Sequence, residues 1–224
     1  MNRPAKGKRQ YSVDVIAITP RDDALAILLE RRSDARNGWT LPWSAPQAGE
    51  GLDDAARRVT EQSVGSSAAW MTQIGAFSDG RHPSDAELSV AYVALVPMGT
   101  AENETPSSSL AWFSVSELPP LSDRQSEMVQ RAITEVRDRL DLYPVAFRLL
   151  PPAFTLSELQ QMYELLLGRR LHKASFRRAL QAAWLVEPTD EWRSEGRGRP
   201  AQLYRYSPRK RRRGRRGVRF DLLG

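Results

Sequence analysis

The most constraining feature of the chain is a capped amphipathic helix predicted between residues 155 and 168. Thr155 and Glu158 have the spacing of a capping box, in which each side chain bonds the backbone N–H of the other residue. Gly168 provides the stop signal, because glycine adopts the left-handed conformation that commonly ends a helix. The apolar residues recur at spacings of three and four: Leu156, Leu159, Met162 or Tyr163, and Leu166. The segment is therefore expected to bury one face.

A second helix is predicted over residues 172–184, after the short turn GRRL. Phe176, Leu180 and Ala183 form its apolar stripe. The opposite face carries Lys173, Arg177, Arg178 and Gln181. Two helices joined by a glycine-containing turn, the second of them basic, indicate a helix-turn-helix. A charged face alone would also suit an ordinary solvated helix.

The residues after this pair favour DNA binding. Residues 185–187 are expected to form a short strand, PTDEWRSEGRGRP an arginine-containing loop, and AQLYRYS a returning strand. Helix, turn, basic helix and basic hairpin, in that order, are typical of a winged helix. The candidate DNA-binding residues are Thr155, Lys173, Ser175, Arg177, Arg178, Gln181, Arg197 and Arg199.

The first half of the chain has the pattern of a sheet with helices. Strands are predicted where β-branched and aliphatic residues concentrate, at 11–19, 25–31, 70–77 and 87–96. An aromatic strand in AWFSVSELPPLSD precedes a Leu-Pro turn. Asp123 to Leu140 is predicted to be an amphipathic helix, because its apolar residues recur at spacings of three and four.

The stretch GEGLDDAARRVTEQSVG, from Gly49 to Gly65, resembles a Nudix box with several replacements. In that family the helical glutamates of the box bind magnesium. The chain keeps Glu50, Arg58 and Gly65 of this pattern. Ser44 stands at the first glycine, Val59 at the glutamate after the arginine, and Gln62 and Ser63 at the Glu-Glu pair. Magnesium prefers hard oxygen ligands, which valine and a neutral amide do not provide, so we expect a Nudix scaffold without a metal or Nudix catalysis.

The surroundings of this box support the resemblance, although residues 52–64 alone would also fit an ordinary surface helix. Trp39, Leu41 and Pro42 match the family's Trp-x-Leu-Pro segment, whereas Trp43 and Ser44 replace a pair of glycines. Such replacements are expected to narrow the mouth of the pocket. A later segment containing Phe77, Asp79, Arg81 and Pro83 resembles the nucleotide-adjacent segment of ADP-ribose-type Nudix domains; the alternative is a hairpin loop with a solvated arginine. The effector-binding residues that the resemblance implies are Arg31, Arg32, Leu41, Glu50, Arg58, Phe77, Asp79 and Arg81.

The whole chain resembles the NrtR family, the Nudix-related transcriptional regulators of NAD metabolism, over most of residues 11 to 207. The most specific matches are FTLSELQQMYELLLGR, the FRR of the second helix, and GRPAQLYRY. The resemblance implies an α+β fold, with a Nudix-like α/β/α sandwich followed by a winged helix-turn-helix domain. It also implies an ADP-ribose-like effector, operator DNA, a homodimer and no cofactor.

Four regions are expected along the chain. They are a flexible N-terminus at 1–10, a Nudix-like effector-binding domain at 11–140 that ends in a connector helix, a winged helix domain at 141–207, and a basic disordered tail at 208–224. The net charge of +6 comes largely from the stretch 209–219, which has eight lysines or arginines and no acid. Such a tail binds anionic polymers without sequence choice.

Composition excludes several classes of protein. The chain has no cysteine, which excludes disulfides and cysteine-based zinc sites, and its two histidines are far apart in sequence. No apolar run is long enough to span a membrane and no signal peptide is apparent, so a cytoplasmic protein is expected.

Two other functions fit parts of the sequence. One is a Nudix hydrolase in which Glu50, Asp54 or Glu61 takes over the metal. Against it, Glu61 is about 100° around the helix from Gln62, so it is expected to point away from the face of Gln62. The other is a nucleic-acid-binding protein that uses its basic tail without sequence preference.

Overall fold

The computed structural model describes residues 11–21, 23–33, 38–97, 109–140, 144–194 and 200–207. The chain divides into two compact units. The first contains Met1–Thr19 and Ala26–Ile133, and the second contains Pro20–Leu25 and Thr134–Gly224. The domain boundary predicted from the sequence lies after residue 140. In the structure, the end of the expected connector helix, from Thr134 on, belongs to the second unit. The expected flexible N-terminus and the basic tail lie outside the described residues.

The first unit is built on a mixed sheet with the central strand order β3-β2-β1-β6-β5. Its strands are β1 (Tyr11–Arg21), β2 (Ala24–Arg31), β3 (Trp39–Thr40), β4 (Trp43–Ser44), β5 (Trp70–Phe77), β6 (Leu88–Leu95) and β7 (Leu110–Ser114). β1 runs parallel to β6, whereas β5 is antiparallel to β6, β7 to β2, and β4 to the start of β1. The four strands predicted from aliphatic content are confirmed, with ends shifted by no more than two residues.

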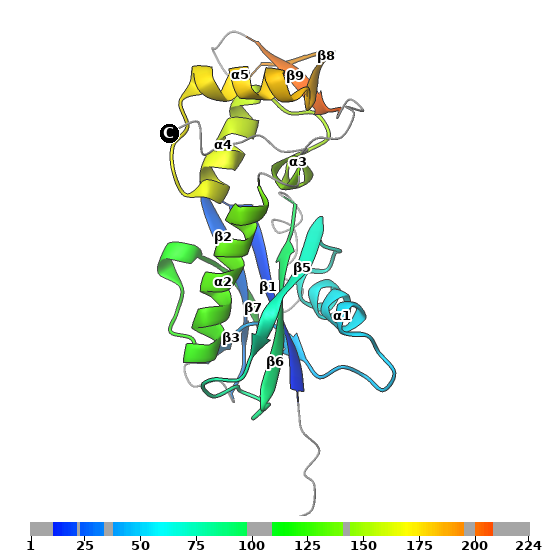
Figure 1. The fold of residues 1–224 in the computed structure, drawn as a ribbon, viewed down its shortest axis with the longest axis vertical. Coiled ribbons are helices and arrows are strands. Elements are labelled where there is room, and N and C mark those ends of the chain that lie inside the picture. The colour runs from blue at the N-terminus through cyan, green and yellow to red at the C-terminus, as the bar shows by residue number, and fades with distance from the viewer. Residues whose placement is uncertain are drawn as a thin grey trace, which may run out of the picture. The chain divides into compact units, whose positions relative to one another are not determined.

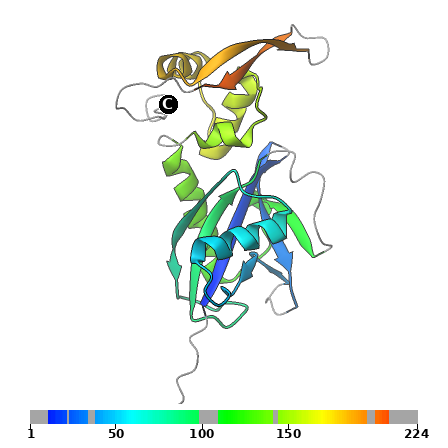
Figure 2. The ribbon, with the colours of Figure 1, turned by 90° about the vertical axis from the view of Figure 1, so that its right-hand side faces the viewer.

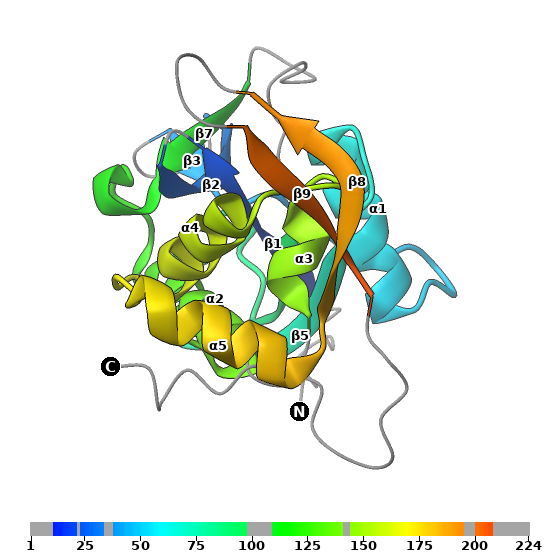
Figure 3. The ribbon, with the colours of Figure 1, turned by 90° about the horizontal axis from the view of Figure 1, so that it is seen from above.

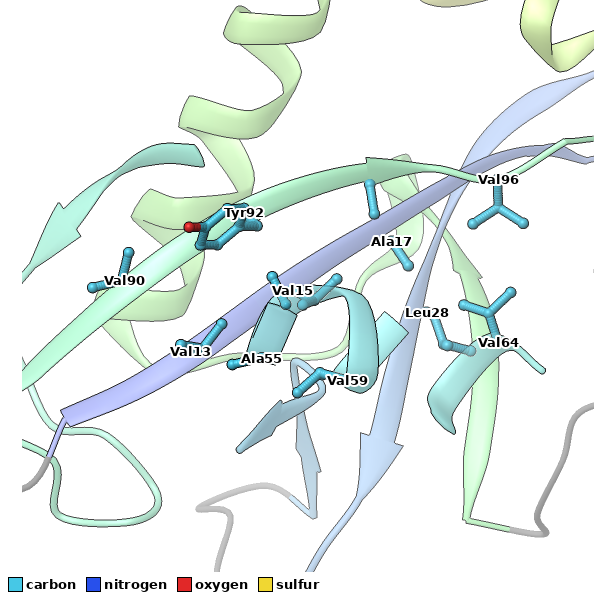
Figure 4. Close-up of a cluster of buried hydrophobic side chains, with 12 residues drawn as sticks. Val13, Val15, Ala17, Leu28, Ala55, Val59, Val64, Val90, Tyr92 and Val96 are labelled. Atoms are coloured by element: carbon cyan, nitrogen blue, oxygen red, sulfur yellow. The ribbon is translucent and has the colours of Figure 1, made fainter. Parts of the chain in front are cut away.

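Two helices cover opposite faces of this sheet (Figures 1 and 2). They are α1 (Leu52–Val64) and the first part of α2 (Asp123–Arg139), which follows the short 3-10 helix η1 (Val115–Glu117). Because both faces are covered, β1 is buried from Ser12 to Pro20. Figure 4 shows the core under α1, where Val59 and Ala55 of the helix lie beside Val13 and Val15 of β1. The predicted α/β/α sandwich is therefore confirmed.

The second unit contains α3 (Val145–Leu149), α4 (Leu156–Leu167), α5 (Lys173–Ala183), β8 (Val186–Arg193) and β9 (Ala201–Tyr206), shown in Figure 3. The capping box is present: Thr155 Oγ1 accepts the Glu158 N–H at 3.1 Å, and Glu158 Oε2 accepts the Thr155 N–H at 2.6 Å. Gly168 ends α4 with a φ of 68°. A Cβ at this residue would lie 2.7 Å from Arg137 Nη2, so no larger residue fits without a shift.

An aromatic core holds the second unit together. The Phe147 ring lies 4.6 Å from Tyr206 and 5.8 Å from Phe154, and Tyr163 lies 5.6 Å from Phe176, measured between centroids. The sequence left open whether Met162 or Tyr163 belongs to the buried stripe of this helix, and both side chains are buried. These rings join α3, α4, α5 and β9. The winged helix fold expected here is confirmed.

Two local features differ from the predicted elements. Helix α3, in the apolar segment YPVAFRLLP, has no counterpart among the elements predicted from the sequence. The strand expected at 185–187 is β8, which continues to Arg193 through residues assigned to a loop. Pro188 is tolerated there because a two-stranded ribbon has no third strand that needs its missing N–H, and the register shifts between Pro188 and Trp192. No described helix is long and apolar enough to cross a membrane.

Candidate functional site

Glu50 and Arg58 form a bidentate ion pair at the start of α1. Arg58 Nε lies 2.7 Å from Glu50 Oε1, and its Nη2 lies 2.7 Å from Glu50 Oε2. The same guanidinium donates to Ser44 Oγ at 3.2 Å and to the Ala45 carbonyl at 3.3 Å. The Arg58 hydrogen bond and the Gln47 backbone N–H lower the pKa of Glu50 to about 2. The pair therefore fixes the loop before α1 and keeps Glu50 ionised.

The outer face of α1 borders an open depression of about 430 Å³, lined by Asp54, Arg57, Arg58, Glu61 and Gln62. Glu61 and Gln62 are both exposed and border this depression from successive positions of the helix. Arg57 pairs with Asp54 at 2.7 Å.

These residues do not fit a magnesium site. Val59 is 3% exposed and packs in the core, and Gln62 carries no charge. Arg57 and Arg58 border the same depression, and their positive charge opposes a divalent cation. Among the described residues, no group of three His, Cys, Asp or Glu side chains is arranged to hold a metal ion.

Trp43 joins several elements at the place where the sequence departs from the family's glycine pair. In β4 it lies opposite Asp14 of β1, its ring meets the His82 ring edge-on at 5.0 Å, and the Arg32 guanidinium lies 4.6 Å from its centroid. His82 Nε2 lies 2.9 Å from Asp14 Oδ1, and both side chains are fully buried. The Ser84 N–H donates to His82 Nδ1 at 3.1 Å, so Nδ1 acts as an acceptor while Nε2 faces Asp14. The sequence reasoning missed this contact.

Arg124, near the start of α2, holds the loop between β5 and β6. Its side chain is almost fully buried and donates to four carbonyls of that loop: Ser78 at 2.7 Å, Asp79 at 2.9 Å, Gly80 at 2.6 Å and Ala86 at 2.8 Å. One buried arginine thus sets the path of the segment that carries Arg81. No sequence signal marked Arg124, because a single arginine in the first turn of a helix is ordinary.

Three predicted effector residues lie together in sequence at this loop. Phe77 is half-buried at the end of β5, and Asp79 is exposed. The Arg81 side chain is 87% exposed and lies 3.5 Å from Asp85. The loop therefore presents a cation and an aromatic ring at the edge of the first unit.

The other predicted effector residues have different surroundings. Arg31 is exposed at the end of β2, whereas Leu41 is fully buried, so its side chain packs in the core. Arg32 faces Trp43, and Glu50 binds Arg58. The eight residues therefore do not form one cluster. Arg32 is linked to the β5–β6 loop indirectly, because it stacks on Trp43 and Trp43 contacts His82 of that loop.

The outer face of α5 is exposed and basic. Phe176 and Leu180 are buried beneath it. Its exposed polar residues are Lys173, Arg177, Arg178 and Gln181, with Ala174 and Ala182 also exposed. Ser175 is half-buried and its Oγ lies 3.2 Å from His172 Nδ1, and the Thr155 hydroxyl is used in the capping box. Arg197 and Arg199 lie outside the described residues.

Two family models match the chain. The model of the NUDIX domain matches residues 8–132, more than half of the chain, and the model of the NrtR DNA-binding winged helix domain matches residues 146–206. The chain belongs to the Nudix family. Its second unit is an NrtR-type winged helix, so the resemblance to NrtR proteins is confirmed.

Known relatives share both units of this Nudix chain. It is 28% identical over 204 residues to the ADPR responsive transcriptional repressor NtrR of Acinetobacter baylyi, across 88% of this chain and 81% of the relative. NrtR of Shewanella oneidensis, crystallised with a 27mer DNA, is similar in structure with a TM-score of 0.76 and 27% identity, over 88% of this chain and 94% of that one. A MutT/nudix family protein of Enterococcus faecalis shares the fold with a TM-score of 0.69 and 20% identity, over 90% and 89% of the two chains.

We expect the ion pair at the start of the Nudix helix to stabilise the fold in a pH-dependent way. The pKa of Glu50 is about 2 in the folded chain and 4.5 ordinarily, so the unfolded chain binds the proton first as the pH falls. The stabilisation is therefore complete above the ordinary value and is lost as the pH approaches about 2. The difference in the free energy of unfolding between the wild type and Glu50→Gln, from urea denaturation, should shrink between about pH 7 and about pH 3.

Glu61→Gln on the same exposed side of α1 serves as the control, since Glu61 has no such pair with Arg58. Its difference from the wild type should change less over the same range. A Glu50→Gln difference that stays constant from neutral to acid pH would contradict the pairing.

Proposed function

We propose that this chain is a DNA-binding transcriptional repressor whose Nudix unit senses ADP-ribose or a related nucleotide metabolite, and that it controls genes of NAD metabolism. The observation that carries the proposal is the basic outer face of α5, presented by a helix-turn-helix whose opposite face is buried. The match to the NrtR DNA-binding model supports it. So do the two relatives, one described as an ADPR responsive repressor and the other crystallised with DNA.

In this proposal α5 is the recognition helix. Arg177 and Arg178 project from its exposed face, and a guanidinium can bond the O6 and N7 atoms of guanine together in the major groove. Lys173, at the start of the helix, is suited to a phosphate contact, which positions the protein without reading sequence. We propose further phosphate contacts for Arg197 and Arg199, which lie between β8 and β9 in sequence. Thr155 contributes by capping α4 rather than by reaching the DNA.

We also propose that the protein acts as a dimer on DNA. One recognition helix of the length of α5 buries too little surface for a specific complex. Two-fold symmetric proteins place two such helices one helical turn apart and so read a palindrome.

The effector is assigned to the first unit, around the β5–β6 loop. The exposed Arg81 supplies a cation for a diphosphate, and the half-buried Phe77 supplies a surface for a ring. Arg124 contributes by holding the backbone of this loop. Glu50 and Arg58 contribute by fixing the loop before α1.

We infer that this unit does not hydrolyse its ligand. A diphosphate hydrolase of the Nudix type depends on carboxylates that hold magnesium, which neutralises charge and activates water. Val59 is buried, Gln62 is neutral, and Glu50 is bound to Arg58. Asp54, the alternative carboxylate on the same helix, is paired with Arg57.

Helix α5 and the basic tail are the two expected sources of DNA affinity, and they should differ in how strongly their contribution depends on the DNA sequence. The protein is first used to select a duplex from a random-sequence pool, and affinities are then measured on the selected and on a random duplex. Arg177→Ala with Arg178→Ala should cost about 1 to 3 kcal/mol per lost base contact on the selected duplex and less on the random one. Deleting residues 209–224 should weaken both by similar factors and reduce the salt dependence.

The matched control is Arg205→Ala, which removes an exposed arginine of β9 that pairs with Glu187. It should leave the ratio of the two affinities unchanged. If the tail deletion erases the sequence preference and the α5 double variant keeps it, α5 is a solvated face and the repressor proposal fails.

Binding of ADP-ribose should occur without turnover. With magnesium present, release of product should stay far below ordinary enzyme rates, on the order of 1 s⁻¹ or more. Calorimetry should detect binding, and Arg81→Ala should weaken it because the diphosphate loses a cation. Arg57→Ala, an exposed arginine of α1, is the control and should have a smaller effect.

Hydrolysis at an ordinary enzyme rate that Glu50→Gln abolishes would show that the chain is an enzyme after all. Unchanged affinity in Arg81→Ala and Phe77→Ala would place the effector elsewhere in the protein.

A further inference from the structure

The turn between α4 and α5 is held by one carboxylate. Glu164, in the last turn of α4, has a side chain that is 11% exposed. Its Oε1 accepts the Leu171 backbone N–H at 2.8 Å and Gln160 Nε2 at 2.9 Å, and its Oε2 lies 3.0 Å from Arg170 Nη1. Gln160 Nε2 also donates to the Leu171 carbonyl at 3.0 Å. The backbone of the turn is therefore bound on both sides of Leu171.

The charge of Glu164 strengthens these bonds. Burial by itself raises the pKa of this carboxyl, but the hydrogen bonds from Gln160 and Leu171, together with Arg170, outweigh burial and hold the pKa below its ordinary value. Glu164 is thus ionised at neutral pH. Hydrogen bonds to an ionised acceptor are roughly twice as strong as those between neutral groups.

The residue that Glu164 holds is next to the start of α5. Leu171 is 5% exposed, and it precedes His172, the N-cap of α5, whose side chain makes no capping hydrogen bond. On the other side of the turn, Gly168 ends α4 in the left-handed conformation, and its backbone N–H donates to the carbonyls of Glu164 and Leu165. The direction in which α5 leaves the turn therefore depends on the Leu171 anchor.

We propose that Glu164 is a positioning residue for DNA recognition, which fixes the turn so that the basic face of α5 is presented in one orientation. This inference rests on the proposed DNA-binding function. Glu164 acts through Leu171 and makes no contact with DNA. Without its acceptor, the Leu171 N–H is left unsatisfied or the turn rearranges, and α5 samples orientations in which its side chains miss the bases.

Positioning and simple electrostatics predict opposite changes in DNA affinity when Glu164 is removed. Removing a negative charge beside a basic surface should strengthen binding to the phosphate backbone on any sequence. Positioning predicts instead that Glu164→Ala weakens binding to the selected duplex. The sign of the change therefore distinguishes positioning from charge.

The test compares three variants of the full chain on the selected and the random duplex. Glu164→Ala should lose about tenfold in affinity on the selected duplex, the reduction expected if the competent orientation of α5 falls to about a tenth of the population, and little or nothing on the random one. Glu164→Gln keeps an oxygen for the Leu171 N–H and should recover most of the loss. Glu191→Ala, which removes an exposed carboxylate of β8, should show no loss on either duplex.

Two further measurements separate positioning from misfolding. Hydrogen exchange at the Leu171 amide should accelerate in Glu164→Ala while exchange within α4 is preserved. If Glu164→Ala does not fold, Gln160→Ala, which removes the second contact to Leu171, should give a smaller loss of the same kind.

The outcomes distinguish this inference from the proposal on which it rests. A wild type with no preference for any duplex overturns the DNA-binding proposal and the positioning role with it. A wild type with a preference that Glu164→Ala retains, or an equal loss on both duplexes, overturns the positioning role alone.

Discussion

The burial of β1 is the constraint on which the first unit depends. The strand is buried from Ser12 to Pro20, so a helix must cover each face of the sheet. Burial also requires partners for its polar side chains, and Asp14 finds them in Ser12 and His82. His82 belongs to the β5–β6 loop, so satisfying Asp14 draws the loop that carries Arg81 to the edge of the sheet. The position of the candidate effector site thus follows from the needs of a buried strand.

The helix α1 has a clear structural role in the first unit. Val59 replaces the glutamate after the arginine of the box and is part of the apolar cluster between α1 and the sheet. A carboxylate in that environment would need a cation or other partners, whereas valine adds apolar contact. The charged residues that remain, Glu50 and Arg58, bind each other and hold the loop before α1.

Much of the fold was predictable because its signals are local. The capping box at Thr155, the glycine stop at 168 and the aliphatic strands each depend on a few neighbouring residues, and all are confirmed. What was missed depends on tertiary contacts. Residues 188–193 were assigned to a loop although they belong to β8, which pairs with β9 on both sides of an irregularity, and α3 is too short for its periodicity to be recognised. The partners of Arg124 lie about forty residues away in sequence, so no local pattern marks them.

The proposed function requires that binding of a metabolite to the Nudix unit changes DNA binding by the winged helix of the same chain. The most direct measurement is the affinity of the full chain for its selected duplex at increasing concentrations of ADP-ribose, with a random duplex as reference. If the two units are coupled in this way, ADP-ribose should weaken binding to the selected duplex by about fivefold or more, the usual range for coupling between sites, and leave binding to the random duplex nearly unaffected. An affinity for the selected duplex that stays constant as ADP-ribose saturates the protein would contradict it.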